Sequence, residues 1–107
     1  MTYRIVITEK AKEDLRGIYE YIAFSLLSPS NAQGFLSRIE NSIKSLENMP
    51  LRFRQYDNEP WKSRNLRLMS VDSFVVFYIP DKEAATVTVI RVMYGGRDTE
   101  NQLNSDG

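Results

Sequence analysis

The stretch SPSNAQGFLSRIENSIKSLENMP, residues 28–50, carries the strongest helical periodicity in the chain. Ser28 before Pro29 is typical of an N-cap followed by the first helical residue, and Ser30 is a second candidate cap. Met49 and Pro50 end the pattern, because the residue before a proline avoids helical geometry. The apolar residues recur every three or four positions and so share one helix face. They are Ala32, Phe35, Leu36, Ile39, Ile43 and Leu46.

The residues before this stretch predict a strand and another helix. Residues 3–7 favour a short strand, and Thr8 is suited to cap a helix whose first turn contains Glu9. We expect this helix over about residues 8–26, and a short link to the next helix makes the pair an antiparallel hairpin. Its apolar stripe has 4-3-4 spacing and consists of Ala11, Leu15, Ile18 and Ile22.

The second half of the chain predicts three consecutive strands. Residues 51–63 show neither period and form a loop, whereas residues 65–71, 74–79 and 86–94 favour strands separated by turn residues. Tight turns make these strands an antiparallel meander. The order β-α-α-β-β-β defines an α+β domain, a helical hairpin packed on an antiparallel sheet, spanning residues 1–107. Residues 98–103 could form a short helix, and residues 104–107 are expected to be frayed.

The last strand contains an unusual feature, a cation in its interior. By simple alternation, Val87, Val89, Arg91 and Met93 share one face, and Thr88, Ile90, Val92 and Tyr94 share the other. We expect the β-branched run of the second set to lie under the helices, so that Arg91 opens on the opposite side. Gly95 and Gly96 allow a sharp turn that would place Arg97 near Tyr94. Arg91 is then either a solvated side chain or part of a cationic rim that also includes Arg64 and Arg67.

Composition excludes several kinds of chemistry. The 107 residues include no cysteine and no histidine, which removes thiol chemistry and the commonest general base and metal ligand. The acidic pairs Glu13–Asp14 and Asp81/Glu83 lack metal-site spacing and are expected to be solvated, so we expect no metal and no cofactor. Neither a signal peptide nor a membrane-spanning run is evident, which favours a cytoplasmic protein.

Aromatic residues and charge add two further expectations. Tyr19, Tyr21 and Tyr78 are expected to be half-buried packing residues, and Trp61 is either a loop anchor or an exposed contact. The net charge is zero, but residues 51–70 carry five basic and two acidic side chains. A neutral chain argues against indiscriminate binding of nucleic acid, whereas a basic middle segment permits a local anionic site.

Several segments taken together resemble the RelE/ParE superfamily of toxins from bacterial type II toxin–antitoxin modules. TEKAKEDLRGIYEYI resembles the first helix of that family, and FLSRIENSIKSLENMP resembles its second helix. SFVVFYIPD and VTVIRVMYGGRD resemble its last two strands and its tail. DLRGI together with FVVFYIP looks more similar to ParE than to RelE.

The resemblance implies a toxin that inhibits a bacterial target, with DNA gyrase expected for a ParE-like protein, and a cognate antitoxin that neutralises it in a hetero-oligomer. It also implies growth inhibition and a role in plasmid stabilization. A RelE-like alternative is a nuclease that cleaves mRNA on the ribosome, and a second alternative is a degenerate, non-toxic interaction module.

Two departures argue against the nuclease. Val75 stands where RelE-type nucleases usually have an arginine, and Tyr94 stands where many relatives have a histidine, whereas Arg97 matches the arginine of the family's tail. Chemically, arginine can stabilise charge on a phosphate and Tyr94 could donate a proton. The candidate catalytic residues, if the chain is a nuclease, are Arg64, Arg67, Arg91, Tyr94 and Arg97.

Overall fold

The computed structural model describes residues 2–96 and 99–105. Its elements run in the order β1 (Arg4–Ile7), α1 (Glu9–Glu20), α2 (Pro29–Lys44), β2 (Arg67–Val71), β3 (Phe74–Asp81), β4 (Thr86–Tyr94) and α3 (Thr99–Ser105). One turn of π-helix, Tyr21–Ser25, extends α1, and short 3-10 turns follow α2. The predicted order β-α-α-β-β-β is confirmed. The helix α3 includes two of the four residues that we expected to be frayed, and residues 106–107 lie outside the described part.

The four strands form one mixed sheet in the order β1-β4-β3-β2. The meander β2-β3-β4 is antiparallel as expected. The expectation of a wholly antiparallel sheet needs correction, because β1 pairs in parallel with β4, from Arg4 opposite Thr86 to Ile7 opposite Val89. A parallel neighbour requires a long crossover connection, and the helical hairpin with the meander provides it.

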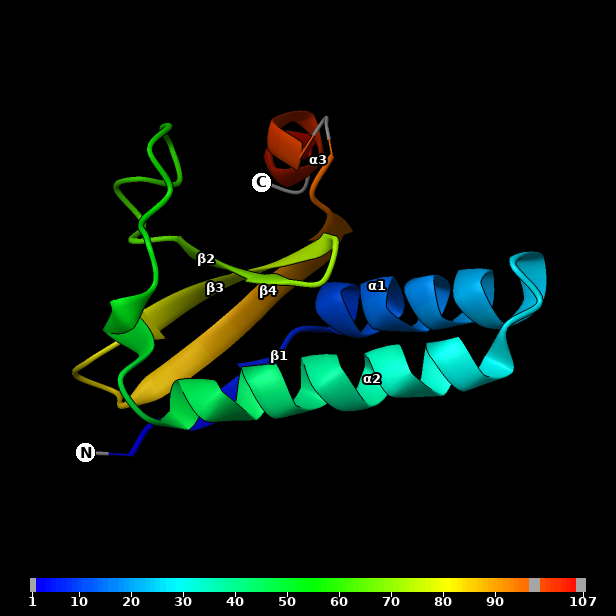
Figure 1. The fold of residues 1–107 in the computed structure, drawn as a ribbon. Coiled ribbons are helices and arrows are strands. Elements are labelled where there is room, and N and C mark those ends of the chain that lie inside the picture. The colour runs from blue at the N-terminus through cyan, green and yellow to red at the C-terminus, as the bar shows by residue number, and fades with distance from the viewer. Residues whose placement is uncertain (1, 97–98, 106–107) are drawn as a thin grey trace.

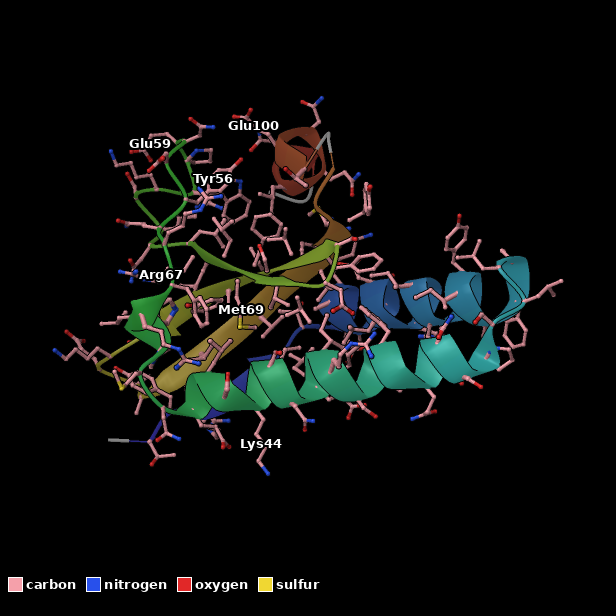
Figure 2. The ribbon with its side chains drawn as sticks, in the orientation of Figure 1. Lys44, Tyr56, Glu59, Arg67, Met69 and Glu100 are labelled. Carbon is pink, nitrogen blue, oxygen red and sulfur yellow. The ribbon has the colours of Figure 1, made fainter. Side chains whose placement is uncertain are left out.

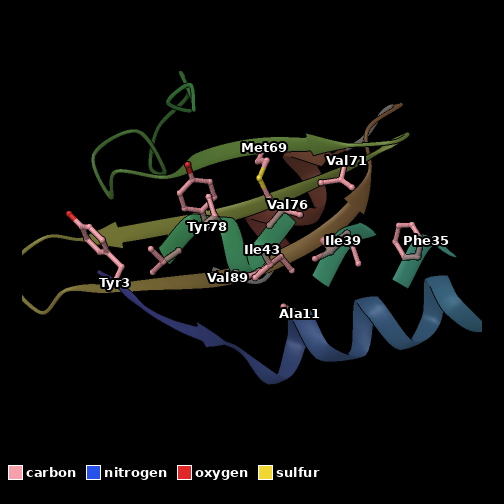
Figure 3. Packing of buried hydrophobic residues seen from close by; sticks show 13 residues of the cluster. Tyr3, Ala11, Phe35, Ile39, Ile43, Met69, Val71, Val76, Tyr78 and Val89 are labelled. Atoms are coloured by element: carbon pink, nitrogen blue, oxygen red, sulfur yellow. The ribbon is translucent and has the colours of Figure 1, made fainter. Parts of the chain in front are cut away.

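The hairpin of α1 and α2 covers one face of the sheet, and α3 lies on the other side (Figure 1). Thr8 caps α1 as predicted, since its hydroxyl oxygen accepts a hydrogen bond from the Ala11 amide at 3.2 Å. Ser28 precedes α2 but makes no side-chain cap bond. The main core lies between hairpin and sheet (Figure 3), and its buried members include Ala11, Phe35, Ile39, Ile43, Val76, Tyr78 and Val89.

A β-bulge in β4 changes the expected faces of that strand. Phe77 pairs with Arg91 but Tyr78 pairs with Val89, so Ile90 is an extra residue. Val87 and Val89 therefore lie under the helices, together with Val92 beyond the bulge. Our placement of Thr88 and Ile90 under the helices was wrong, because simple alternation ignores the inserted residue. The placement of Arg91 on the opposite side was correct.

A second apolar cluster covers the sheet face that the hairpin leaves open. Its buried members are Trp61, Leu66, Phe77, Met93 and Leu103. Leu103 belongs to α3, and the Trp61 indole Nε1 donates a hydrogen bond to Asn104 Oδ1 at 3.0 Å. Trp61 is thus a loop anchor rather than an exposed contact, and it joins the 58–65 turn to the C-terminal helix.

Candidate functional site

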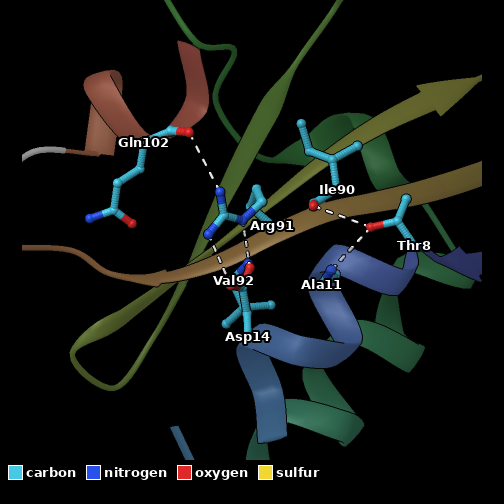
Figure 4. A network of polar contacts seen from close by, with 7 residues as sticks. All are labelled: Thr8, Ala11, Asp14, Ile90, Arg91, Val92 and Gln102. Atoms are coloured by element: carbon cyan, nitrogen blue, oxygen red, sulfur yellow. Dashed lines mark hydrogen bonds and ion pairs between the residues drawn. The ribbon is translucent and has the colours of Figure 1, made fainter. Parts of the chain in front are cut away.

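The side chain of Asp14 is the centre of a buried polar network between α1 and β4 (Figure 4). Its two carboxylate oxygens accept hydrogen bonds from Arg91 Nε at 2.7 Å and from Arg91 Nη2 at 2.9 Å. The side chains of Arg91 and Asp14 are 10% and 13% exposed, so the pair is largely removed from water. A bidentate guanidinium–carboxylate pair is strong and geometrically specific. The expectation that Asp14 is solvated was wrong.

The same network closes the open edge of β4. Strand β1 pairs with β4 only as far as Val89, and α1 then continues along that edge. The Thr8 amide donates to the Val89 carbonyl at 3.1 Å, and the Thr8 hydroxyl donates to the Ile90 carbonyl at 3.2 Å. Asp14 accepts from the Val92 amide at 3.0 Å. Helix α1 therefore satisfies strand groups that would otherwise lie unpaired at a sheet edge.

Arg67 lies at the start of β2 and holds the segment after α2 (Figure 2). Its Nη1 donates to the carbonyls of Leu51 at 3.1 Å and Phe53 at 2.6 Å. The hydroxyl of its strand partner, Tyr78, donates to the Pro50 carbonyl at 2.5 Å. Burial raises the pKa of Tyr78 to about 12. Tyr78 is fully buried, rather than half-buried as expected, and Arg67 and Tyr78 together fix the same turn.

Arg64 and Tyr94 remain exposed, on different parts of the molecule. The Arg64 guanidinium lies 4.8 Å from the centroid of the Trp61 ring, a cation–π contact on the side of the second apolar cluster. Tyr94 is 60% exposed and makes an edge contact with Phe74, with ring centroids 6.0 Å apart. Arg97 lies outside the described residues.

The two glycines after β4 are explained by close approach rather than by left-handed backbone. Neither has a positive φ. A Cβ on Gly95 would lie 3.0 Å from Val75 Cγ2, and one on Gly96 would lie 2.2 Å from Tyr94 Cε2. The glycines therefore allow the turn to pass close to β3 and to the Tyr94 ring.

Two grooves border these residues. The larger one, of about 1020 Å³, lies between α1 and the end of β4. We call it the α1–β4 groove; its lining includes Glu13, Asp14, Gly17, Ile18, Tyr21, Phe74, Arg91, Val92 and Tyr94. A smaller groove of about 240 Å³ lies on the opposite sheet face, and Val75, Phe77, Arg54, Tyr56 and Asp57 are among its lining residues. Its charged lining residues within the described part, Arg54 and Asp57, have opposite signs.

The fold brings Arg91 and Tyr94 to one groove but keeps the other described candidates apart. Arg91 pairs with Phe77, whereas Arg67 pairs with Tyr78 at the other edge strand and points to the 50–53 turn. Sequence reasoning missed Asp14 as a structural partner. One signal was present, because Asp14 lies three residues after Ala11 and four before Ile18, beside the apolar stripe.

The described residues also limit what other chemistry the surface can support. No group of three or more histidine, cysteine, aspartate or glutamate side chains in residues 2–96 and 99–105 could hold a metal ion. In the same part of the chain, no helix has both the length and the apolar character required to cross a membrane.

This small α+β architecture, with a helical hairpin on a four-stranded mixed sheet, is that of the RelE and ParE toxins. Residues 5–99 match the family model described as ParE toxin of type II toxin-antitoxin system, parDE, and the chain belongs to that family. None of the curated protein sequences matches this chain.

Three solved structures show the same fold at low identity. The chromosomal ParDE system of P. aeruginosa has a TM-score of 0.70 and 19% identity, over 87% of this chain and 96% of that one. The RelBE2 toxin–antitoxin complex of Mycobacterium tuberculosis has a TM-score of 0.62 and 21% identity, over 88% of this chain and 99% of that one. A mutant of the E. coli toxin RelE in the free state has a TM-score of 0.64 and 16% identity, over 98% of this chain and 93% of that one.

Proposed function

We propose that this chain is the toxin of a type II toxin–antitoxin module, that it inhibits DNA gyrase by binding, and that a cognate antitoxin neutralises it. The family match supports the first part, and two of the similar structures, ParDE and RelBE2, are of such toxin–antitoxin systems. Action on gyrase would place the protein in the cytoplasm, and growth inhibition or plasmid stabilization would be its consequence.

The observation that carries the choice of a binding mechanism is the engagement of the interior arginines. Two nitrogens of the Arg91 guanidinium donate hydrogen bonds to the two carboxylate oxygens of Asp14, and Arg67 donates to two backbone carbonyls. An arginine that neutralises a buried carboxylate is poorly placed to stabilise charge on a scissile phosphate, because breaking the pair would leave Asp14 uncompensated.

Position 75 supports the same choice. Val75 lines the smaller groove, so an arginine at this position would lie beside that groove. In this chain the valine side chain instead packs against the second apolar cluster. Among the described lining residues of this groove, Arg54 is balanced by Asp57, so they supply no surplus of the positive charge that binding of ribosome-bound mRNA would favour.

The test is induction of the chain in a heterologous bacterium, followed by labelling of DNA and of protein synthesis. We expect DNA synthesis to stop first, and growth to recover when a cognate antitoxin encoded by a neighbouring gene is co-expressed. We also expect the purified chain to inhibit supercoiling by purified gyrase. Codon-phased mRNA cleavage on purified ribosomes, lost in Arg97→Ala, would instead establish the RelE-like nuclease. Normal growth at verified soluble expression would establish a degenerate, non-toxic module.

A matched pair of variants makes the labelling experiment sharper. Val75→Arg would add the missing cation beside the smaller groove, and Ser70→Arg would add the same charge at an exposed position of β2. We expect both variants to leave mRNA intact, because a binding inhibitor lacks the remaining catalytic groups. Cleavage gained by Val75→Arg alone would mean that the rest of a nuclease site is present.

A further inference from the structure

The end of the helical hairpin exposes an apolar, uncharged surface. Residues 21–37 contain no Asp, Glu, Lys or Arg, although 26% of the chain is charged. Within this stretch Tyr21, Phe24, Leu26 and Leu27 are 56%, 67%, 55% and 83% exposed, so our expectation of a half-buried Tyr21 was wrong. We call Phe24, Leu26 and Leu27 the hairpin tip. It projects beyond the sheet, away from both termini (Figure 1).

At two positions of this region the residue type is less favourable for the stability of the fold than an available alternative. Gly17 lies in the middle of α1, where glycine is less stable than alanine, and no atom outside its own surroundings lies within 4 Å of the position a Cβ would take. Leu27 has a φ of 51°, a left-handed conformation that favours glycine or asparagine. The contacts among residues 2–96 and 99–105 explain neither choice, whereas an external partner that approaches Gly17 closely and covers Leu27 explains both.

Gly17 and the hairpin tip are two parts of one surface. Gly17 and Tyr21 are one turn apart on α1, and both line the α1–β4 groove together with Tyr94. Tyr21 begins the π-helical turn Tyr21–Ser25, which contains Phe24 and leads directly into Leu26 and Leu27. A protruding apolar tip and an adjoining groove without a Cβ therefore lie end to end.

We propose that this surface binds a second copy of the chain, with the tip of each copy in the α1–β4 groove of the other. A two-fold contact places the same patch on both sides, so its charges must be self-compatible. The tip has no charge, and within the described lining Asp14 and Arg91 neutralise each other. Glu13, also in the lining, would then face an uncharged segment of the partner rather than another carboxylate.

The contact is small. On each copy the surface consists of the α1–β4 groove and a few exposed apolar side chains, namely Tyr21, Phe24, Leu26, Leu27 and Tyr94. This corresponds to the lower end of specific interfaces, below about 1,200 Å² in total. We therefore expect a concentration-dependent dimer with a dissociation constant of about 1 μM or weaker.

The test is sedimentation equilibrium of the purified chain over a range of concentrations, with one variant for each half of the contact. Leu27→Asp alters the tip, and Gly17→Trp fills the groove. Each should weaken the dimer by at least about tenfold. Met49→Asp is the matched control, since Met49 is 71% exposed but follows α2 at the other end of the hairpin, and it should dimerise as the wild type does. Circular dichroism checks that every variant is folded.

Mixing the two variants gives the decisive readout. A Leu27→Asp chain keeps its groove and a Gly17→Trp chain keeps its tip, so the mixed dimer retains one of the two contacts, whereas either homodimer retains none. The mixture should associate more strongly than either variant alone. A wild type that stays monomeric up to about 1 mM, dimers unaffected by both variants, or no recovery on mixing would each overturn the proposal. So would a monomer in which Gly17→Trp abolishes binding of the antitoxin, since the surface would then belong to the antitoxin.

Discussion

Asp14 and Arg91 lie 77 residues apart in the chain and form a bidentate ion pair, with a third hydrogen bond from the Val92 amide to the same carboxylate. The pair joins the first helix to the last strand. Its main effect is on the stability of the fold, since the pair holds two opposite charges in hydrogen-bonded contact where both are largely removed from water.

Removal of Asp14 should therefore be costly. We expect Asp14→Ala to lower the free energy of unfolding by about 3–5 kcal/mol, because it removes the carboxylate that accepts two hydrogen bonds from the largely buried Arg91 and one from the Val92 amide. Urea denaturation measures the loss. Glu9→Ala is the control, because the Glu9–Lys12 pair is exposed and should contribute less than about 0.5 kcal/mol.

A second substitution tests that reason. In the Asp14→Ala background, Arg91→Met should restore part of the lost stability, because it removes a largely buried charge that has lost the Asp14 carboxylate while keeping an apolar stem. A double variant less stable than Asp14→Ala would show that Arg91 stabilises the fold by contacts other than this pair.

Tyr78 should make stability depend on alkaline pH. Its pKa is raised by burial from 10.0 to about 12 in the folded chain, so between these values the unfolded state loses the proton and the folded state keeps it. Stability is unaffected below pH 10 and falls as pH rises toward 12, at about 1.4 kcal/mol per pH unit from this group. Urea denaturation at several pH values should show a smaller decline in Tyr78→Phe. Equal declines would contradict the assignment.

The core under the hairpin depends on Ile39, which is fully buried. Ile39→Ala should lower the free energy of unfolding by about 2–5 kcal/mol, as for other large-to-small changes in a packed core. Glu40→Ala, at the next and exposed position of α2, is the control. A loss below about 0.5 kcal/mol in denaturant unfolding would mean that this part of the core is loosely packed.

The exposed side chain at the end of β4 offers a test of function separate from stability. If the α1–β4 groove contacts the target, Tyr94→Ala should reduce growth inhibition while the unfolding midpoint changes little, because Tyr94 is 60% exposed. Gly95→Val should also reduce inhibition, but with some loss of stability, because a Cβ there would press on Val75. Full growth inhibition by a stable Tyr94→Ala chain would remove the groove from the functional surface.

The sequence predicted the order of elements well because their patterns are local. The stripe on α2 and the cap at Thr8 depend on residues within a few positions of each other, and both predictions are confirmed. The parallel pairing of β1 with β4 and the pairing of Asp14 with Arg91 connect residues about 80 positions apart. No local period reports such contacts, so the mixed sheet and the buried carboxylate could not be read from the pattern.

The prediction of which β4 residues face the helices was wrong for another reason. Its nine residues look like an uninterrupted alternation, and nothing in the letters marks Ile90 as the inserted residue. The partner strand determines where a bulge forms, because the bulge has to bring Tyr78 opposite Val89 and Phe77 opposite Arg91. Of the candidate site, the sequence did not indicate that Arg67 and Arg91 are engaged within the fold.

The bulge at Ile90 reverses which residues of β4, odd-numbered or even-numbered, face the hairpin. Before it, the odd-numbered residues Val87 and Val89 face the hairpin; after it, the even-numbered Val92 does. Strict alternation through all nine residues, without the bulge, would place Arg91 on the face of Val87 and Val89, among the apolar side chains of the main core, while Val92 turned outward. The bulge therefore keeps the Arg91 guanidinium out of the main core, on the side of the strand from which it reaches Asp14.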